Sequence, residues 1–116
     1  MNRYHAVFYE EEDGGKPVAV FLRYYKDRNS GVYKKCLQYI RALEEHGLSL
    51  PRNYIVHVEG TVWELRPEFG GVEYRLFFGS IGAEKFGIVS AYQKTWEQVP
   101  ENVKKLAAER IKEMEE

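Results

Sequence analysis

The chain has 116 residues, of which 44% are hydrophobic and 30% are charged, and its formal net charge at pH 7 is −1. This length matches one domain over residues 1–116 with one modest core. The charge balance excludes the global basicity of a free-standing nucleic-acid binder. A single cysteine, Cys36, excludes an internal disulfide framework. No charged-then-apolar leader or long apolar run occurs, so we expect a soluble cytoplasmic protein that contacts no membrane.

The first half of the sequence predicts a strand followed by two helices. Residues 3–9 are rich in aromatic and branched side chains, as strands are. A charged, glycine-bearing turn follows, and Pro17 suits the first turn of a helix over residues 18–27. The run Val18 to Phe21 would also serve as a strand, so this element keeps two interpretations.

A second helix is predicted between Ser30 as N-cap and Gly47 as C-terminal stop. Its apolar residues recur every three or four positions, which lines one helix face; they are Tyr33, Cys36, Leu37, Ile40 and Leu43. Because Cys36 belongs to this stripe, we interpret it as a small buried hydrophobe and not as a nucleophile.

Two alternating runs around a Pro- and Gly-bearing turn, residues 62–78, predict an antiparallel hairpin with a loop longer than two residues. Because side chains alternate along a strand, Glu64 and Arg66 share one face of the sheet. Arg75 of the second strand falls on the same face, opposite the apolar set Tyr74, Leu76 and Phe78. If the apolar sets face a helical layer, two guanidinium groups and a carboxylate lie on the open face.

Residues 79–85 are expected to turn into a third adjacent strand over residues 86–94. Alternation places a small set under the helices, namely Gly87, Val89, Ala91 and Gln93. It places another set on the open face with the arginines, namely Ile88, Ser90, Tyr92 and Lys94. Pro100 opens a last helix with apolar residues at helical spacing. The expected fold class is therefore α+β, with an N-terminal strand and two helices, a three-stranded antiparallel meander and a C-terminal helix.

The trio Glu64, Arg66 and Arg75 has two interpretations. It is either a solvated sheet face with weak cross-strand ion pairs, or a phosphate site, because a guanidinium group matches phosphate with two parallel hydrogen bonds. His57 is more often a partly buried hydrogen-bonding residue than a general acid or base. The sequence has no phosphate loop and no metal-ligand spacing, so no cofactor or metal is expected.

Several motifs together resemble a known family. They are Trp-Glu-Leu-Arg at residues 63–66, Tyr-Arg before an apolar run at residues 74–78, Tyr-Gln-Lys-Thr at residues 92–95, and Val-Pro at residues 99–100. The order of elements and these motifs are similar to the RelE superfamily of bacterial toxins, and most similar to its HigB-like, phage-derived branch. These toxins are the RNA-cleaving halves of type II toxin-antitoxin pairs.

The resemblance implies a metal-independent mRNA endoribonuclease, commonly ribosome-dependent, that is held inactive by a cognate antitoxin of helix-turn-helix type. The RNA 2′-hydroxyl would attack its own 3′-phosphate, a reaction that needs a base, positive charge and a proton donor. Family cationic positions match Arg66 and Arg75, for phosphate stabilisation, and Lys94, as clamp or proton donor. Tyr92 would stack on a base or help proton transfer. Glu64 is either the base or an ion-pair partner that orients an arginine.

The chain departs from the family pattern in its charge. The basic tract before the last helix is reduced to Lys94, so binding to ribosomal RNA by counterion release would depend on a cluster near the helix junction, namely Lys26, Arg28, Lys34 and Lys35. The alternative is a catalytically inactive RelE-fold module that binds or regulates a protein. An active toxin should show converging cations with net positive potential, whereas a binding module should show them neutralised by Glu64 and Glu73.

Overall fold

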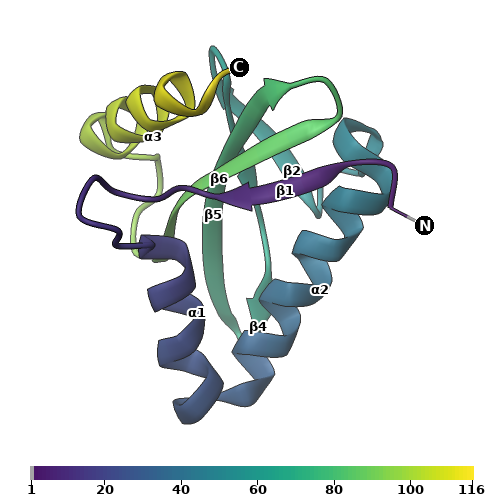
Figure 1. Cartoon of the computed structure of the whole chain (residues 1–116). Helices are drawn as coiled ribbons and strands as arrows, with labels where there is room; N and C mark the ends of the chain where they lie inside the picture. Colours follow the sequence, from purple (N-terminus) through teal and green to yellow (C-terminus); the bar gives the residue numbers. More distant parts are fainter. Residues whose placement is uncertain (1) are drawn as a thin grey trace.

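Six strands and three α-helices make up the computed structural model, which describes residues 2–116 (Figure 1). In chain order the elements are β1 (His5–Phe8), α1 (Pro17–Arg28), α2 (Ser30–His46), a short 3-10 helix η1 (Gly47–Ser49), β2 (Ile55–Glu59), β3 (Val62–Leu65), β4 (Glu68–Phe69), β5 (Val72–Gly82), β6 (Lys85–Gln93) and α3 (Glu101–Met114). The α+β class is confirmed. The helical interpretation of residues 18–27 is confirmed as well, and the strand alternative is wrong.

The two N-terminal helices follow each other almost without a break. Pro17 occupies the first turn of α1, where its missing N–H has no intrahelical partner to lose. Only Asn29 separates α1 from α2, and its N–H bonds the carbonyl of Tyr25 at 2.8 Å. The buried stripe of α2 is Val32, Cys36, Ile40 and Leu43, so the spacing predicted from the sequence is confirmed, with Val32 added at its start.

The sheet is mixed, with strand order β1-β6-β5-β3-β2 and β4 paired to β5 off this path. β1 runs parallel to β6, and the other pairs are antiparallel. The antiparallel meander therefore has four strands where three were expected, because residues 55–59 pair with β3. The turn expected over residues 79–85 is wrong: β5 continues to Gly82, and Ala83 and Glu84 alone form the turn.

Helices cover both faces of the sheet (Figure 1). α1 and α2 pack on one face, which presents Leu65, Leu76, Phe78 and Ile88. α3 packs on the other face, against Val62, Phe77, Ile81 and Val89. The face that was expected to be open is thus a second hydrophobic core, and charged residues on it lie beside or beneath α3. Within residues 2–116, no helix is both long and apolar enough to cross a bilayer.

A β-bulge in β6 changes which side chains face which core. Phe77 pairs with Ser90 and Phe78 pairs with Ile88, so Val89 is an extra residue. Ile88 therefore packs toward α1 and α2, while Val89 packs toward α3, which reverses the assignment made from alternation. The carbonyl of Val89 accepts a 2.8 Å hydrogen bond from Arg110 of α3, which stabilises the bulge. Beyond the bulge the predicted alternation holds.

Candidate functional site

The three cations predicted from the sequence converge at one end of the central strands. Arg66 directly follows β3, Arg75 lies within β5, and Lys94 directly follows β6. β5 pairs with both β3 and β6, so these three positions are neighbours across the sheet. The backbone N–H of Lys94 also donates to the carbonyl of Glu73 at 2.8 Å, which fixes the end of β6 beside β5.

Arg75 is the centre of this cluster, and its side chain is only 2% exposed. Its Nε lies 2.8 Å from Oε2 of Glu64, and its Nη2 lies 2.8 Å from Oε1 of Glu73. Its Nη1 donates to the carbonyl of Tyr74 at 2.8 Å. Two carboxylates and a carbonyl thus satisfy all three guanidinium nitrogens, so Arg75 does not present a free cation to solvent.

The two carboxylates extend the cluster to the other cations. Oε2 of Glu64 lies 3.4 Å from Nε of Arg66, and Oε2 of Glu73 lies 3.5 Å from Nζ of Lys94. The result is a chain of alternating charge: Arg66, Glu64, Arg75, Glu73, Lys94. Three cations and two carboxylates leave a formal charge of +1, so the cluster is partly but not fully neutralised.

Exposure divides the members of the chain into an inner and an outer group. Arg75 and Glu64 are inside, the latter with 9% of its side chain exposed. The outer members Arg66, Lys94 and Glu73 are 28%, 24% and 42% exposed. The hydrogen bond from Arg75, assisted by the charge of Lys94, lowers the pKa of Glu73 below its ordinary value. Glu73 is therefore an ionised and weakly basic carboxylate at neutral pH.

A small pocket of about 200 Å³ opens onto this cluster, lined by Asn53, Arg66, Glu68, Glu73 and Arg75. Asn53 and Glu68 were not predicted from the sequence. Glu68 pairs directly with Glu73 across β4 and β5, because Gly70 and Gly71, with φ of 62° and 79°, close a two-residue turn. The expectation of a loop longer than two residues was wrong, and the Gly-Gly pair was the signal that would have placed Glu68 here.

Tyr92 is opposite Arg75 in the sheet, as alternation predicted, but it lies outside the residues that line this pocket. Its ring packs 5.9 Å from Phe77 and 5.8 Å from Trp96, measured between centroids. It belongs to the aromatic edge of the core under α3. The structure therefore places Tyr92 near the cluster but commits its ring to packing.

His57 lies apart from this cluster. It pairs with Trp63, and their rings are 4.9 Å apart. Its Nε2 hydrogen-bonds with the carbonyl of Gly60 at 2.8 Å. The hydrogen bond agrees with the interpretation of His57 as a hydrogen-bonding residue, but the side chain is exposed, so the expected partial burial is wrong.

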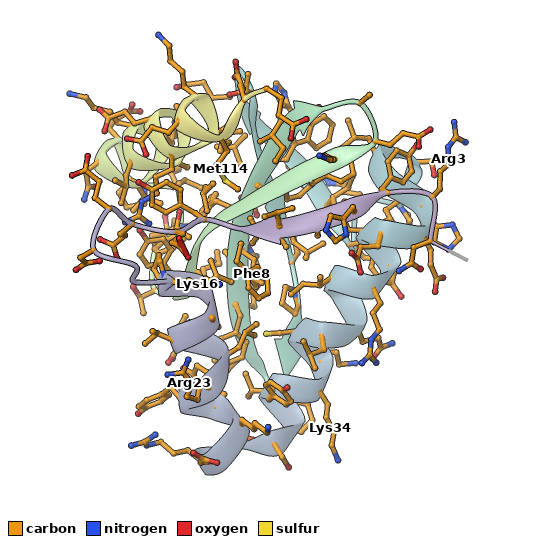
Figure 2. The ribbon with its side chains drawn as sticks, viewed as in Figure 1. Arg3, Phe8, Lys16, Arg23, Lys34 and Met114 are labelled. Carbon is orange, nitrogen blue, oxygen red and sulfur yellow. The ribbon has the colours of Figure 1, made fainter. Side chains whose placement is uncertain are left out.

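The predicted RNA-binding lysines and arginine gather where α1 meets α2. Lys26 and Arg28 lie in the last turn of α1, and Lys34 and Lys35 lie in the first turns of α2. Figure 2 shows Lys34 projecting away from the sheet. The guanidinium of Arg28 lies 4.1 Å from the ring centroid of the exposed Tyr24. This junction is a basic surface with an exposed aromatic side chain, separate from the pocket.

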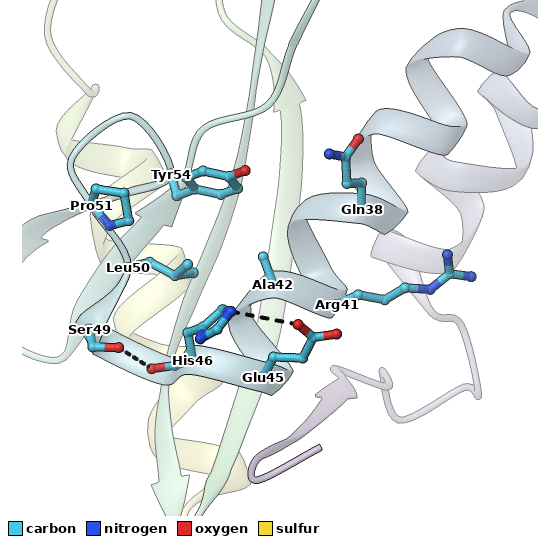
Figure 3. A pocket seen from close by; sticks show the side chains of 9 residues that line it. All are labelled: Gln38, Arg41, Ala42, Glu45, His46, Ser49, Leu50, Pro51 and Tyr54. Carbon is cyan, nitrogen blue, oxygen red and sulfur yellow. Dashed lines mark hydrogen bonds and ion pairs between the residues drawn. The ribbon is translucent and has the colours of Figure 1, made fainter. Parts of the chain in front are cut away.

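A larger hollow of about 600 Å³ lies elsewhere, between the C-terminal half of α2 and residues 49–54 (Figure 3). Leu50, Pro51 and Tyr54 stand on its loop side, with Ala42 and His46 on the helix side. None of the residues predicted to form the site lines this hollow. Its size alone does not associate it with the charged cluster.

The fold and the cluster define a small α+β protein with an ion-pair network, centred on the buried Arg75, at the ends of its central strands. The model of the family described as "Phage derived protein Gp49-like (DUF891)" matches residues 24–112, which include every member of the network. The chain belongs to this family of Gp49-like, phage-derived proteins. A search of curated proteins gives no significant match. The phage-derived part of the resemblance is thereby confirmed, and the HigB-like branch stays a prediction.

Proposed function

We propose that this chain is a RelE-superfamily toxin of a type II toxin-antitoxin system that cleaves mRNA without a metal. The observation that carries the proposal is the convergence of Arg66, Arg75 and Lys94 in one ion-pair cluster with a formal charge of +1, beside a small pocket that Arg66 and Arg75 line. Cations fixed on neighbouring strands are suited to stabilise a phosphorane, whose charge exceeds that of the ground-state phosphodiester. Membership in a phage-derived family supports the same assignment.

In the proposed reaction the 2′-oxygen forms a bond to phosphorus while the bond from phosphorus to the 5′-oxygen breaks. The products are a 2′,3′-cyclic phosphate and a 5′-hydroxyl. We assign charge stabilisation to Arg66 and Lys94, which are partly exposed, and proton donation to the 5′-oxygen to Lys94. Glu64 is the assigned acceptor of the 2′ proton, and Arg75 holds this carboxylate in place at 2.8 Å.

A second candidate function has its own supporting observation. Glu64 and Glu73 satisfy Arg75, which is the neutralised arrangement expected of a protein-binding or regulatory module that has kept the fold and lost the chemistry. The net charge of −1 also favours the binding module, since the chain as a whole then has little electrostatic attraction to RNA. The two functions differ in whether the outer cations matter for RNA cleavage.

The test is induced expression with growth and mRNA ends as readouts. The variant is Arg66→Gln/Lys94→Gln, because both side chains are partly exposed and their loss leaves Arg75 paired. A matched control is Lys105→Gln/Lys112→Gln, which removes two exposed cations from α3. Growth arrest with new 5′-hydroxyl ends in the wild type and control, abolished in the site variant, is the expected result. Normal growth and intact mRNA with soluble wild type would favour the binding module.

The same proposal includes two partners. A cognate antitoxin of helix-turn-helix type would restore growth when co-expressed. The ribosome would meet the basic junction of α1 and α2. Lys26→Gln/Lys34→Gln is then expected to weaken co-sedimentation with ribosomes, and to flatten its dependence on salt by about two counterions.

A further inference from the structure

Glu73 makes the contacts that a substrate phosphate would make. Its Oε1 lies 2.8 Å from Nη2 of Arg75, and its Oε2 lies 3.5 Å from Nζ of Lys94. Two oxygens of one anionic group thus bridge Arg75 and Lys94, two of the three cations of the cluster. A phosphodiester has two non-bridging oxygens that would bridge the same pair.

The two carboxylates of the cluster differ in how costly it is to move each one away from its cationic partners. The Glu64 side chain is 9% exposed and shares its Oε2 between Arg75 and Arg66, so moving it would strand buried charge. The Glu73 side chain is 42% exposed and faces the pocket. Rotation of Glu73 into solvent therefore costs its two ion pairs but buries no charge.

Glu68 opposes the position that Glu73 holds. It lies directly across β4 and β5 from Glu73, and both side chains line the pocket. Like charges at directly opposite positions on paired strands repel each other. The attraction of Glu73 to Arg75 and Lys94 is therefore partly offset within the same pocket, which lowers the cost of displacing it.

We propose that Glu73 is an internal anion that occupies the phosphate site of Arg75 and Lys94, and that a phosphate-bearing ligand binds by displacing it. The inference rests on the proposed function in taking RNA as that ligand. Displacement uncovers Nη2 of Arg75 and frees Nζ of Lys94 while Glu64 still holds Nε of Arg75. The saturated Arg75 of the free protein and a phosphate-binding Arg75 are then two states of one site.

The experiment measures binding of inorganic phosphate, and of a short single-stranded RNA, by calorimetry at low salt. Glu73→Gln is expected to bind phosphate about tenfold more tightly than the wild type, because the competing charge within contact distance is gone. Glu68→Gln is the matched control, since it removes an equal charge from the same pocket without releasing a cation. A change below about threefold is expected there. Equal affinities for the wild type and Glu73→Gln would overturn the proposal.

A second measurement uses the wild type and needs no substitution. The Nε–Hε signal of Arg75 in nitrogen-edited NMR is expected to shift on titration with phosphate, together with the side-chain carboxyl signal of Glu73. An unchanged Glu73 signal at saturating phosphate would refute displacement. Tighter phosphate binding by Glu73→Gln without RNA cleavage in any variant would keep this inference and reject the nuclease. RNA cleavage by the wild type, together with equal phosphate affinities of the wild type and Glu73→Gln, would keep the nuclease and reject displacement of Glu73.

Discussion

Replacing Arg75 by methionine is expected to destabilise the fold strongly. The substitution keeps much of the side-chain volume but leaves Glu64, with 9% of its side chain exposed, without its 2.8 Å partner. It also removes the donor to the carbonyl of Tyr74. Removing one partner of a buried ion pair costs about 3–5 kcal/mol. With a urea slope of about 2 kcal/mol/M, the unfolding midpoint should fall by about 2 M.

A double-mutant cycle separates the stranded charge from lost packing. Glu64→Gln/Arg75→Met is expected to recover part of the midpoint, because no buried carboxylate then depends on the 3.4 Å contact with Arg66 alone. Glu73→Gln alone should lower the midpoint less than Arg75→Met does, since the Glu73 side chain is 42% exposed. A midpoint of Arg75→Met within about 0.5 M of the wild type, or a double variant no more stable than Arg75→Met, would contradict a large cost of removing the partner of Glu64.

Three further outcomes are expected. Gly79→Ala should lower stability by about 1–3 kcal/mol in thermal unfolding, because its Cβ would lie 2.5 Å from the carbonyl oxygen of Thr61; full stability would show that the strands can separate there. The pKa of Glu73 is lower in the folded protein than its unfolded value of about 4.3, so Glu73 stabilises the fold above that pH, and this contribution is lost as pH falls through the folded pKa. The urea midpoints of the wild type and Glu73→Gln should therefore approach each other below pH 4. A difference between the midpoints that stays constant with pH would contradict this. Burial raises the pKa of Cys36 to about 12, so an aromatic disulfide reagent at pH 8 should label it only after unfolding, and rapid labelling of the native protein would contradict its burial.

The helices were predictable from the sequence because their signals are local. Apolar residues from Val32 to Leu43 recur at helical spacing, and Gly47 ends the run at φ 59°. Alternation likewise placed Arg66, Arg75 and Lys94 together, since each lies in or just after a strand of the meander. These features depend on residues near each other in the chain.

The β-bulge in β6 and the helical layer on the second face of the sheet were not predicted from the sequence, because they depend on contacts between residues distant in the chain. The carbonyl of Val89 in the bulge accepts a hydrogen bond from Arg110 of α3, and the sequence of the strand itself does not indicate an extra residue. α3 covers the face of the sheet that carries Arg75, and it packs there against Val62 and Phe77. A signal for that cover was present in Val62 and Phe77, two large apolar side chains on the face expected to be open. A strand pair that is apolar on both faces needs two covering layers.

The parallel pairing of β1 with β6 joins residues 5–8 to residues 85–88. A contact of such long sequence separation closes a large loop, so it forms late and slowly in folding. During synthesis, the N-terminal strand can contact α2 but has no strand to pair with until β6 has left the ribosomal exit tunnel. By then Arg66 and Arg75 are already outside the tunnel, and Lys94 and α3 follow β6 in the chain. The charged cluster is thus completed only after β6 and Lys94 have been synthesised, so a chain truncated before β6 leaves β1 without its strand partner and lacks Lys94 of this site.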